Sequence, residues 1–440
     1  MSEPEVFEDA TRRKVPLYVK IILGVILGTL AGIFTPALAI NGSEIGKIVI
    51  TLLRTLATPL ILFAVLDAFV RIRIPARKGA ILLCLSALNA CVAIGIGLGV
   101  SNLVRGGERS VNIGQAIRNE AGHPKLAKST GAKPVVTDVE PTLNPIENLK
   151  SYVPDSIVAP FQKNSVIAVV FLAVISGLAI RRVRDRGDAA TVEGIDRIGS
   201  VIHAGFAVLQ QLLEWIILLV PYAVCLIVGG VVAKTGPKVF ADLGIFLVTV
   251  GLGLFLHAFV YYSLLLTVLG RTNPIKFFRG AADAIVTSLS AGSSLATLPV
   301  TLKCLDKNLG VSGDSARLAA CVGTNLNHDG IILYEAAAAL FICQALGFHL
   351  SFAQQMTVAV ASVMAGIGIA GVPEAGLITL PLVLKAAGLP DAVAISVFAV
   401  ILPVDWMLGR CRAMVNVISD MTVATLLDRL SPGEVEQPLV

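Results

Sequence analysis

The chain has 440 residues, of which 55% are hydrophobic and only 15% are charged, and its formal net charge is +5. This charged fraction lies well below the roughly 25% of soluble domains and, with a mean hydropathy of +0.82, excludes an ordinary soluble domain. The modest net charge indicates no nucleic-acid-binding surface. The seven Cys residues lack the paired spacing of a metal site or a disulfide framework. The composition therefore predicts an integral membrane protein.

Eight segments are apolar and long enough to cross a bilayer, which takes about 20 residues of helix. In chain order they are 17–40, 47–70, 79–104, 152–180, 199–232, 238–269, 316–347 and 392–428. Two further apolar segments, 280–311 and 352–390, are irregular because small residues, Gly and Pro interrupt them. The pattern predicts an all-α membrane protein with eight transmembrane helices and two irregular segments.

Basic residues concentrate in three short loops, 71–78, 181–186 and 271–279. Under the positive-inside rule these loops face the cytoplasm. The longer polar connection at 105–150 then lies on the outer side, and both termini are expected to be cytoplasmic.

Two nine-residue stretches share the pattern L-x-T-L-P-x-x-L-K, namely LATLPVTLK at 295–303 and LITLPLVLK at 377–385. Each follows a run of small residues, and the second run ends at Gly376. A chance match in a Leu-rich chain is the alternative to a true repeat. If the repeat is real, the single span between the two copies makes them enter the membrane from opposite sides, as an inverted-topology repeat. Such repeats place substrate and ion sites near the bilayer midplane, where irregular backbone lines a cavity. The runs of small residues are therefore candidate binding segments.

Several polar and charged residues lie inside apolar helices, where each charge is costly and should pair or face a polar cavity. They are Asp329, Glu335, Asp405, Arg410, Arg412, Asn416 and Asp420. Asp405, Arg412, Asn416 and Asp420 are spaced by 7, 4 and 4 residues, which puts them on one helix face. One cation and two anions there suit an anionic ligand bound together with a cation. A buried structural ion pair is the alternative interpretation for any single residue.

Five motifs follow one another in segment 280–428: SSLATLP, NHDG, LYEA, AGVPEAGLITLPLVLKAAGLP and VDWMLGRCRAMVNVISD. With these motifs the segment resembles the dicarboxylate/amino acid:cation symporters, which include excitatory amino acid transporters, archaeal aspartate transporters and bacterial C4-dicarboxylate transporters. The resemblance implies a homotrimer surrounded by lipid in the cell membrane. It implies a secondary active transporter rather than an enzyme, with no cofactor other than a coupling cation. It further implies an elevator mechanism, in which a transport domain moves along a scaffold.

The resemblance also divides the chain into domains. Scaffold helices 1 and 2 lie in 1–78 and scaffold helices 4 and 5 in 151–235, with an extracytoplasmic loop at 105–150. The transport domain comprises helix 3 at 79–104 and residues 236–430, and 431–440 form a cytoplasmic tail. Residues 236–430 hold helix 6, a re-entrant hairpin at 280–311, helix 7 at 316–347, a second hairpin at 352–390 and helix 8 at 392–428.

Carried over residue by residue, the resemblance implies a site for an acidic substrate. Ser293, Ser294 and Asn416 match positions that hold the main carboxylate of the substrate, and Gly376 belongs to the second hairpin at the same site. Arg412 matches the Arg that holds a second carboxylate, because a planar guanidinium suits bidentate pairing.

Two departures from the family pattern bear on the substrate. Gly409 and Ala413 stand where amino acid transporters have an Asp and a Thr that bind the substrate ammonium. An ammonium without a carboxylate partner is poorly compensated in a dry site. The bacterial C4-dicarboxylate members also lack that Asp and carry Ala after the Arg. A C4-dicarboxylate such as succinate, fumarate or malate is therefore favoured, with aspartate or glutamate as the alternative.

The resemblance places two sodium sites at carbonyl and carboxylate oxygens, which suit hard cations. Their ligands are Gly323, Asn327, Asn416 and Asp420 at one site and Asp329 at the second. His328 and Ile331, however, replace a Met and a Thr of the family motif, and segment 82–90 lacks the expected Tyr and Thr/Ser ligands.

A second hypothesis for the coupling ion is that transport is coupled to protons, together with fewer sodium ions. Glu335 matches a Glu that carries a proton in mammalian members, and His titrates in the physiological range. His328 and Glu335 are therefore the proton-coupling candidates. The alternative for His328 is a hydrogen bond across the transport domain.

Other classes of protein fit less well. An intramembrane hydrolase would need a nucleophile motif such as G-x-S-x-G or a metal motif such as H-E-x-x-H, and neither occurs. A passive channel remains the other alternative, and accumulation against a gradient would separate it from a coupled transporter. The isolated His203, His257 and His349 are interpreted as satisfied or interfacial side chains.

Overall fold

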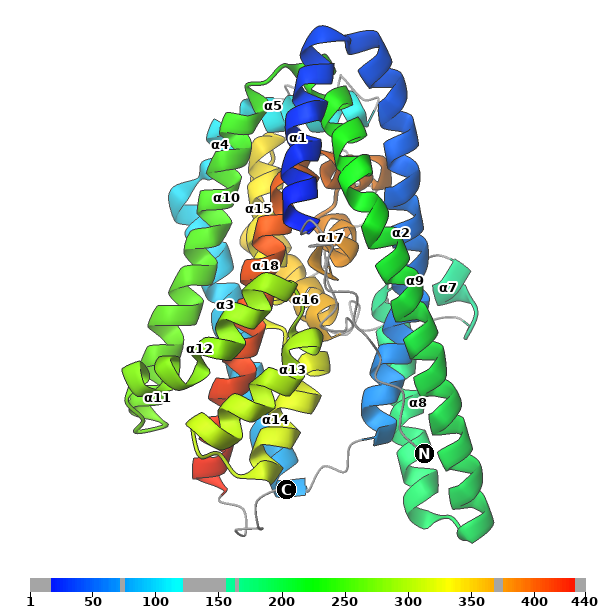
Figure 1. Ribbon diagram of the computed structural model, residues 1–440, viewed down its shortest axis with the longest axis vertical. Helices are drawn as coiled ribbons and strands as arrows, with labels where there is room; N and C mark the ends of the chain where they lie inside the picture. The colour runs from blue at the N-terminus through cyan, green and yellow to red at the C-terminus, as the bar shows by residue number, and fades with distance from the viewer. Residues whose placement is uncertain (1–16, 72–75, 122–155, 163–165, 368–374, 432–440) are drawn as a thin grey trace, which may run out of the picture.

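The computed structural model describes residues 17–71, 76–121, 156–162, 166–367 and 375–431 (Figure 1). Within these ranges the chain is helical and contains no strand. In chain order the helices are α1 (Leu17–Phe34), α2 (Pro36–Arg71), α3 (Ala76–Val104), α4 (Gly106–Arg109), α5 (Val111–Glu120), α7 (Ala159–Gln162), α8 (Val166–Arg186), α9 (Ala189–Thr235), α10 (Val239–Phe255), η1 (Leu256–Tyr261), α11 (Tyr262–Val268), α12 (Pro274–Ala291), α13 (Ser294–Lys303), η2 (Cys304–Asn308), α14 (Gly313–Leu326), α15 (Asp329–Ala345), α16 (Phe352–Ile367), α17 (Ala375–Ala386) and α18 (Asp391–Leu430). The turns η1 and η2 are π-helical.

In the described part of the chain, five helices are apolar and long enough to cross a membrane. They are Pro36–Asp67, Arg77–Arg109, Ala189–Thr235, Val239–Val268 and Asp391–Leu430. The prediction of an all-α membrane protein with several spans is thereby confirmed, while the count of eight spans stays a prediction. The predicted span 316–347 folds as two helices, α14 and α15. Each irregular segment also contains two helices in contact, α12 with α13 and α16 with α17.

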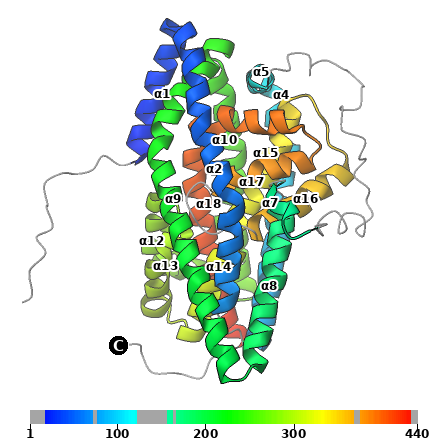
Figure 2. The ribbon, with the colours of Figure 1, turned by 90° about the vertical axis from the view of Figure 1, so that its right-hand side faces the viewer.

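The long helices pack as two groups (Figures 1 and 2). Helices α1, α2, α8 and α9 form the α9 group, and Figure 2 shows α2, α8 and α9 side by side along the molecule. Helices α15 and α18 are the centre of the α18 group, with α3, α10, α14 and α17 packed against one or both. Every residue of α15 is buried. Polar side chains on α15 must therefore find partners inside the protein.

Three glycines four residues apart, Gly24, Gly28 and Gly32, bring α1 close to α9. A Cβ at Gly24 would lie 2.6 Å from the carbonyl oxygen of Pro221, closer than side-chain carbons approach any atom. Small residues at this spacing let membrane helices bring their backbones together. The large side chains of α1 then lie on its other face, where many of them are exposed.

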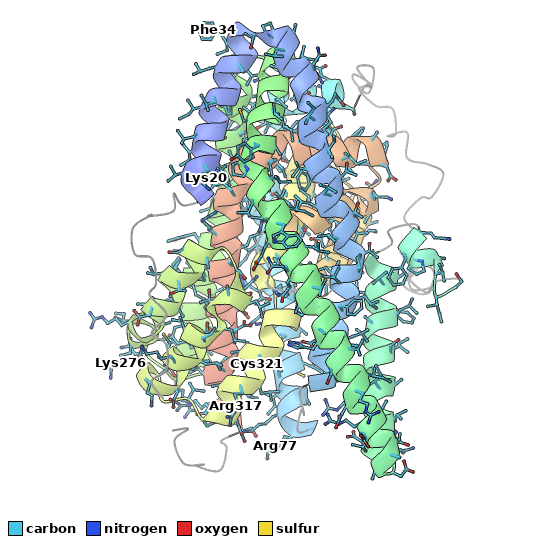
Figure 3. The ribbon with its side chains drawn as sticks, turned by 45° about the vertical axis from the view of Figure 1, so that its right-hand side comes forward. Lys20, Phe34, Arg77, Lys276, Arg317 and Cys321 are labelled. Carbon is cyan, nitrogen blue, oxygen red and sulfur yellow. The ribbon has the colours of Figure 1, made fainter. Side chains whose placement is uncertain are left out.

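Basic residues near the starts of three helices, α3, α12 and α14, lie toward one end of the molecule. Arg77, Lys276 and Arg317 lie at the end opposite Phe34, where α1 ends (Figure 3). This placement agrees with the prediction that loops 71–78 and 271–279 share one side of the membrane. Which side is cytoplasmic stays a prediction.

The segment expected as an outer loop, 105–150, contains the short helices α4 and α5, and α5 is tied to both groups. At its start, Asp242 of α10 accepts two backbone N–H groups, at 2.7 and 3.2 Å, and so satisfies the open helix end. At its last residue, Glu120 lies 2.5 Å from Lys47 Nζ of α2 and 2.8 Å from Lys234 Nζ of α9. The side chain of Glu120 is 3% exposed, so its charge depends on the two ammonium groups.

Glu120 should make stability depend on pH. Burial raises its pKa, but the hydrogen bonds and charges of Lys234 and Lys47 outweigh burial and hold the pKa of Glu120 below its usual value. A carboxyl group with a lowered folded-state pKa contributes stability above its unfolded pKa, and this contribution is lost as pH falls through the folded pKa. We expect Glu120→Gln to lower the free energy of unfolding by about 1–3 kcal/mol at pH 7, and to flatten the loss on acidification.

Melting temperatures of the purified protein between pH 7 and pH 3 would measure this effect. The matched control is Glu193→Gln, because Glu193 and Arg197 form an exposed pair within α9. Its effect should stay within about 0.5 kcal/mol. Equal losses for the two variants would contradict a stabilising role of Glu120.

Candidate functional site

The chain leaves the helical conformation at Asn327 and His328, between α14 and α15. Their backbone angles are φ −117°, ψ 77° and φ −112°, ψ 56°. A break exposes N–H and C=O groups that a continuous helix would pair. The Gly330 N–H at the start of α15 is satisfied by Oδ1 of Asn416 on α18, at 2.9 Å. The NHDG motif therefore lies at a helix break that is held against α18.

The side chains at the break reach two different helices. Nδ2 of Asn327 donates to Ser419 Oγ at 2.8 Å and to Asp420 Oδ1 at 3.0 Å, both on α18. Nδ1 of His328 lies 2.8 Å from the carbonyl oxygen of Gly366 on α16 and must be the donor there, since a carbonyl only accepts. His328 therefore makes the bond that the alternative interpretation describes, between the break and the second hairpin segment.

Asp420 packs against Gly323, one turn before the break. A Cβ at Gly323 would overlap the Oδ1 atom of Asp420, so only glycine leaves room for this carboxylate. Asp420 is 1% exposed. Together with Asn327 it forms a buried polar contact between α14 and α18.

Asp329, the first residue of α15, is fully buried. Its Oδ2 atom accepts two hydrogen bonds, from the Tyr262 hydroxyl at 2.7 Å and the Ser419 hydroxyl at 2.6 Å. Its Oδ1 atom accepts none from the described residues. One oxygen of this carboxylate is thus held by the protein and the other is available to a ligand.

Arg412 lies in the middle of α18 with its guanidinium buried. Nη1 and Nη2 donate to the two carboxylate oxygens of Asp405, at 2.7 and 2.8 Å, in the bidentate geometry that favours Arg over Lys. Its Cζ atom lies 4.0 Å from the ring centroid of Tyr334 on α15, a cation–π distance. A Cβ at Gly376 would lie 3.0 Å from Cζ of Arg412. The second hairpin segment therefore approaches this cation through its backbone.

Glu335 lies one residue beyond Tyr334 and is fully buried. Its Oε1 atom accepts a short hydrogen bond of 2.5 Å from Thr379 Oγ1 on α17, while Oε2 has no hydrogen-bond partner among the described residues. Glu335 therefore joins α15 to the second hairpin segment, whose Gly376 lies beside Arg412 of α18.

The remaining candidate residues lie on α13 and α18. The Ser293 hydroxyl caps α13 by accepting the Ala296 N–H at 3.1 Å. Ser294 is buried, and its hydroxyl has no hydrogen-bond partner in the described structure. On α18 both Gly409 and Ala413 are buried, and neither brings a polar side-chain atom to the site.

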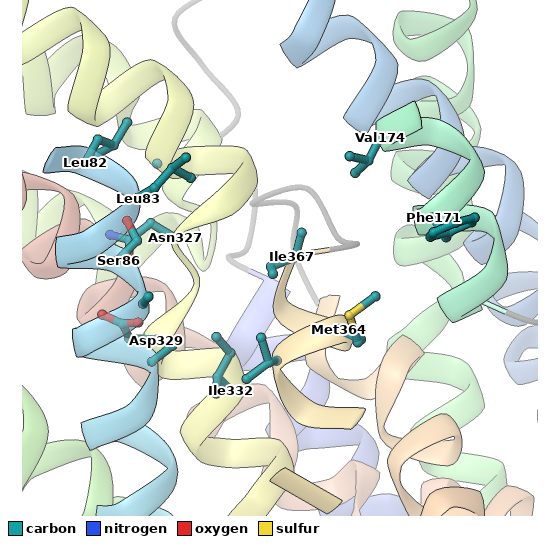
Figure 4. A pocket seen from close by; sticks show the side chains of 14 residues that line it. Leu82, Leu83, Ser86, Phe171, Val174, Asn327, Asp329, Ile332, Met364 and Ile367 are labelled. Carbon is teal, nitrogen blue, oxygen red and sulfur yellow. The ribbon is translucent and has the colours of Figure 1, made fainter. Parts of the chain in front are cut away.

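A cavity of about 410 Å³ lies between the break and the α9 group (Figure 4). Leu82 of α3, Phe171 of α8 and Met364 of α16 belong to its apolar walls. Asn327 and Asp329 line it on the side of the break, across from Phe171 (Figure 4).

The oxygens at the break have the chemistry of a cation site. Oδ1 of Asn327 and Oδ1 of Asp329 are buried and accept no hydrogen bond from the described residues, and Ser86 of α3 lines the same cavity. Leaving a buried carboxylate oxygen unsatisfied is costly. A hard cation bound by these oxygens would remove that cost. The residues present therefore fit a hard cation, which Asn327 and Asp329 would hold.

Several residues of the site were not singled out from the sequence. Tyr334 lies in the motif LYEA and Ser419 in the motif VDWMLGRCRAMVNVISD. Both are uncharged, whereas the candidate residues beside them, Glu335 and Asp420, are charged. His257, expected to be a satisfied or interfacial side chain, is fully buried, and its Nε2 atom lies 3.0 Å from the Tyr262 hydroxyl. Asn89, in segment 82–90, donates to Ser419 Oγ at 3.4 Å. Uncharged polar residues inside apolar helices are the sequence signal that indicates such positions.

The chain is similar to proteins of a known family. The family model described as "Sodium:dicarboxylate symporter family" matches residues 17–430. Among curated proteins, the chain is 34% identical over 274 residues to excitatory amino acid transporter 3 of Mus musculus, which covers 62% of the chain and 50% of the relative. It is 40% identical over 213 residues to excitatory amino acid transporter 2 of Homo sapiens, and this match covers 48% of the chain and 36% of the relative. It is 32% identical over 317 residues to excitatory amino acid transporter 1 of Homo sapiens, and this match covers 71% of the chain and 56% of the relative.

The chain spans about half the length of the curated relatives it matches. The family is one of transporters, which confirms the expectation that the chain is not an enzyme and that it is a multi-pass protein of the cell membrane. The family model covers almost the whole chain, including every helix that carries the site. The chain therefore belongs to the sodium:dicarboxylate symporter family.

Proposed function

We propose that the protein is a secondary active symporter that couples the uptake of a small acidic substrate to a cation. The observation that carries this proposal is the buried guanidinium of Arg412, placed between Asp405, Tyr334 and the backbone of Gly376. A buried cation of this kind in a membrane helix suits the binding of a carboxylate, which would share Arg412 with Asp405 or replace Asp405.

For the coupling ion we favour sodium at Asp329 and Asn327, with Asp420 and the carbonyl groups of Gly323 and Asn416 at the neighbouring site. The unpartnered oxygens of Asn327 and Asp329 support this choice. Proton coupling through Glu335 is the second candidate, since Oε2 of this buried residue has no hydrogen-bond partner among the described residues. Of the two proton candidates, His328 has the weaker support, because Nδ1 already donates to a backbone carbonyl.

The first candidate substrate is an acidic amino acid, aspartate or glutamate, because the relatives are named as excitatory amino acid transporters. The second is a C4-dicarboxylate, and one specific observation favours it. Gly409 and Ala413 supply no polar side-chain atom at the positions where the resemblance puts the ammonium ligands. We further propose a homotrimer that works by an elevator mechanism, with the α9 group as scaffold and the α18 group as transport domain.

Uptake into proteoliposomes tests this function. Labelled aspartate, glutamate and succinate are offered under a sodium gradient alone, a proton gradient alone, or neither. We expect accumulation of at least one acidic substrate above equilibrium under the sodium gradient. Accumulation under the proton gradient alone would establish the second coupling ion. Equilibration without accumulation under either gradient would refute coupled transport and indicate a channel.

The double substitution Gly409→Asp with Ala413→Thr should shift substrate preference toward aspartate. The new carboxylate would pair with the substrate ammonium, and a charge-assisted hydrogen bond of this kind contributes about 1.5–3 kcal/mol. The measurement is the ratio of aspartate to succinate uptake, expected to rise about tenfold or more. The matched control is Gly409→Asn with Ala413→Thr, which has a similar size and no charge. An equal rise in the control would contradict ammonium recognition by the carboxylate.

A further inference from the structure

His257 and Tyr262 are brought together by the π-helical turn η1 between α10 and α11. The N–H of Tyr262 donates to the carbonyl oxygen of His257, five residues earlier, as in a π-helix. The wider turn places residues five apart above one another, whereas an α-helix places residues four apart there. The two side chains accordingly meet, with Nε2 of His257 3.0 Å from the Tyr262 hydroxyl. Isolated π-turns of this kind are frequent at functional sites.

The contact between these side chains has a direction. Tyr262 donates its hydroxyl hydrogen to Oδ2 of Asp329 at 2.7 Å, so its oxygen can only accept from His257. His257 must therefore carry its hydrogen on Nε2. Its Nε2 atom lies 3.7 Å from Oδ2 of Asp329 itself, too far for a hydrogen bond. His257 thus acts on the carboxylate through Tyr262.

A second hydroxyl completes the arrangement around Asp329. Ser419 of α18 donates to the same Oδ2 atom at 2.6 Å and accepts from Nδ2 of Asn327 and Nδ2 of Asn89. One donor hydrogen and two acceptor sites are all that a serine hydroxyl has, so its orientation is fixed. Asn89 in turn accepts from the Tyr261 hydroxyl at 2.8 Å.

Because of these bonds, the two oxygens of Asp329 have different surroundings. Two hydroxyl donors use both lone pairs of Oδ2 and prevent the carboxylate from rotating. Oδ1 keeps its lone pairs and has no partner among the described residues.

We propose that Tyr262, oriented by His257, is a positioning residue for the coupling cation: it holds one oxygen of Asp329 and so presents the other to the cation. This inference rests on the proposed function, because it assigns the cation to Asp329. Ligands of metal ions are commonly oriented by a second set of hydrogen bonds. Tyr262 has that relation to Asp329, and it lies on α11, outside the sequence motifs that indicated the site.

The test is cation binding by purified Tyr262→Phe, which loses one oxygen atom and keeps the ring. The readout is the sodium concentration that gives half of the maximal thermal stabilisation, without substrate. The matched control is Tyr261→Phe, which removes a hydroxyl one residue away that bonds Asn89 and not Asp329. Melting temperatures without sodium report whether each variant is folded, and uptake at saturating sodium gives the maximal rate.

We expect Tyr262→Phe to raise the half-saturating sodium concentration about tenfold or more, and Tyr261→Phe to change it by less than about threefold. The half-saturating sodium concentration of Tyr262→Phe should change by a larger factor than its maximal uptake rate, because the lost hydroxyl acts on the cation site and not on the substrate site. An unchanged sodium constant in Tyr262→Phe, with a wild type that responds to sodium, would overturn this inference alone. A wild type that shows no sodium response would overturn the proposed sodium coupling and this inference with it.

Discussion

Arg412→Cys is expected to reduce uptake of acidic substrates at least about 100-fold, because it removes the bidentate partner of a carboxylate. The same change also leaves Asp405 buried without its cation, since the guanidinium holds both carboxylate oxygens. Breaking a buried pair by removing one partner costs about 3–5 kcal/mol. Loss of uptake in the single variant could therefore report either binding or stability, and the experiment must separate them.

Asp405→Asn combined with Arg412→Cys makes that separation. It removes the orphaned charge, so the melting temperature should recover a substantial part of the loss. Uptake should not recover if Arg412 binds substrate. Arg410→Cys is the matched control on the same helix, because Arg410 donates to the Trp406 carbonyl and stacks on its ring. Recovery of uptake in the double variant would show that Arg412 supports only the fold.

The second large effect is expected from Gly323→Ala. A Gly→Ala change inside a helix normally stabilises a protein by about 0.5–1 kcal/mol. Here the new methyl group would overlap Oδ1 of Asp420 and push that carboxylate away from Asn327. We expect the opposite sign, a loss of about 1–3 kcal/mol from overpacking, together with weaker stabilisation by sodium.

The control for this change is Gly99→Ala in α3, where a Cβ would meet nothing within 4 Å. It should leave the melting temperature equal or slightly raised and the sodium response unchanged. Thermal melts of both variants with and without sodium make the comparison. If Gly323→Ala is as stable and as responsive as Gly99→Ala, Asp420 has no part in cation binding.

The main elements of the fold follow from patterns that a sequence displays directly. Hydropathy marks the long helices, because a span needs a continuous apolar run. Asn327, His328 and Asp329 interrupt such a run at the place where the structure breaks the helix. The two hairpin segments were visible because small residues, Gly and Pro interrupt theirs.

The side-chain pairs inside the site are harder to predict from the sequence. Asp405 and Arg412 lie on one face of α18, but spacing alone did not decide whether Arg412 binds Asp405 or an external ligand, because both use the same fork of donors. The contact of His257 with Tyr262 depends on the π-turn η1, which a hydropathy pattern does not distinguish from an α-turn. His257 and Tyr262 are five residues apart, whereas the side chains that meet on an α-helix are three or four residues apart.

The short helices in segment 105–150 are also hard to predict from local sequence. Their polar sequence indicated a loop, and it is also typical of a short helix whose ends are satisfied by other parts of the chain. Asp242 at one end and Lys47 and Lys234 at the other supply those partners. All three are distant in sequence, so no local pattern connects them with α5.

The π-turn η1 contains one residue more than the α-turn it replaces. Each residue advances an α-helix by about 100°, and the wider turn absorbs that rotation. The helices on either side, α10 and α11, therefore keep the relative orientation of a continuous helix, and the extra residue changes only which side chains of the turn lie above one another. In evolution, the insertion or deletion of a single codon in Leu256–Tyr261 can therefore change the neighbour of the Tyr262 side chain while α10 and α11 stay packed as before.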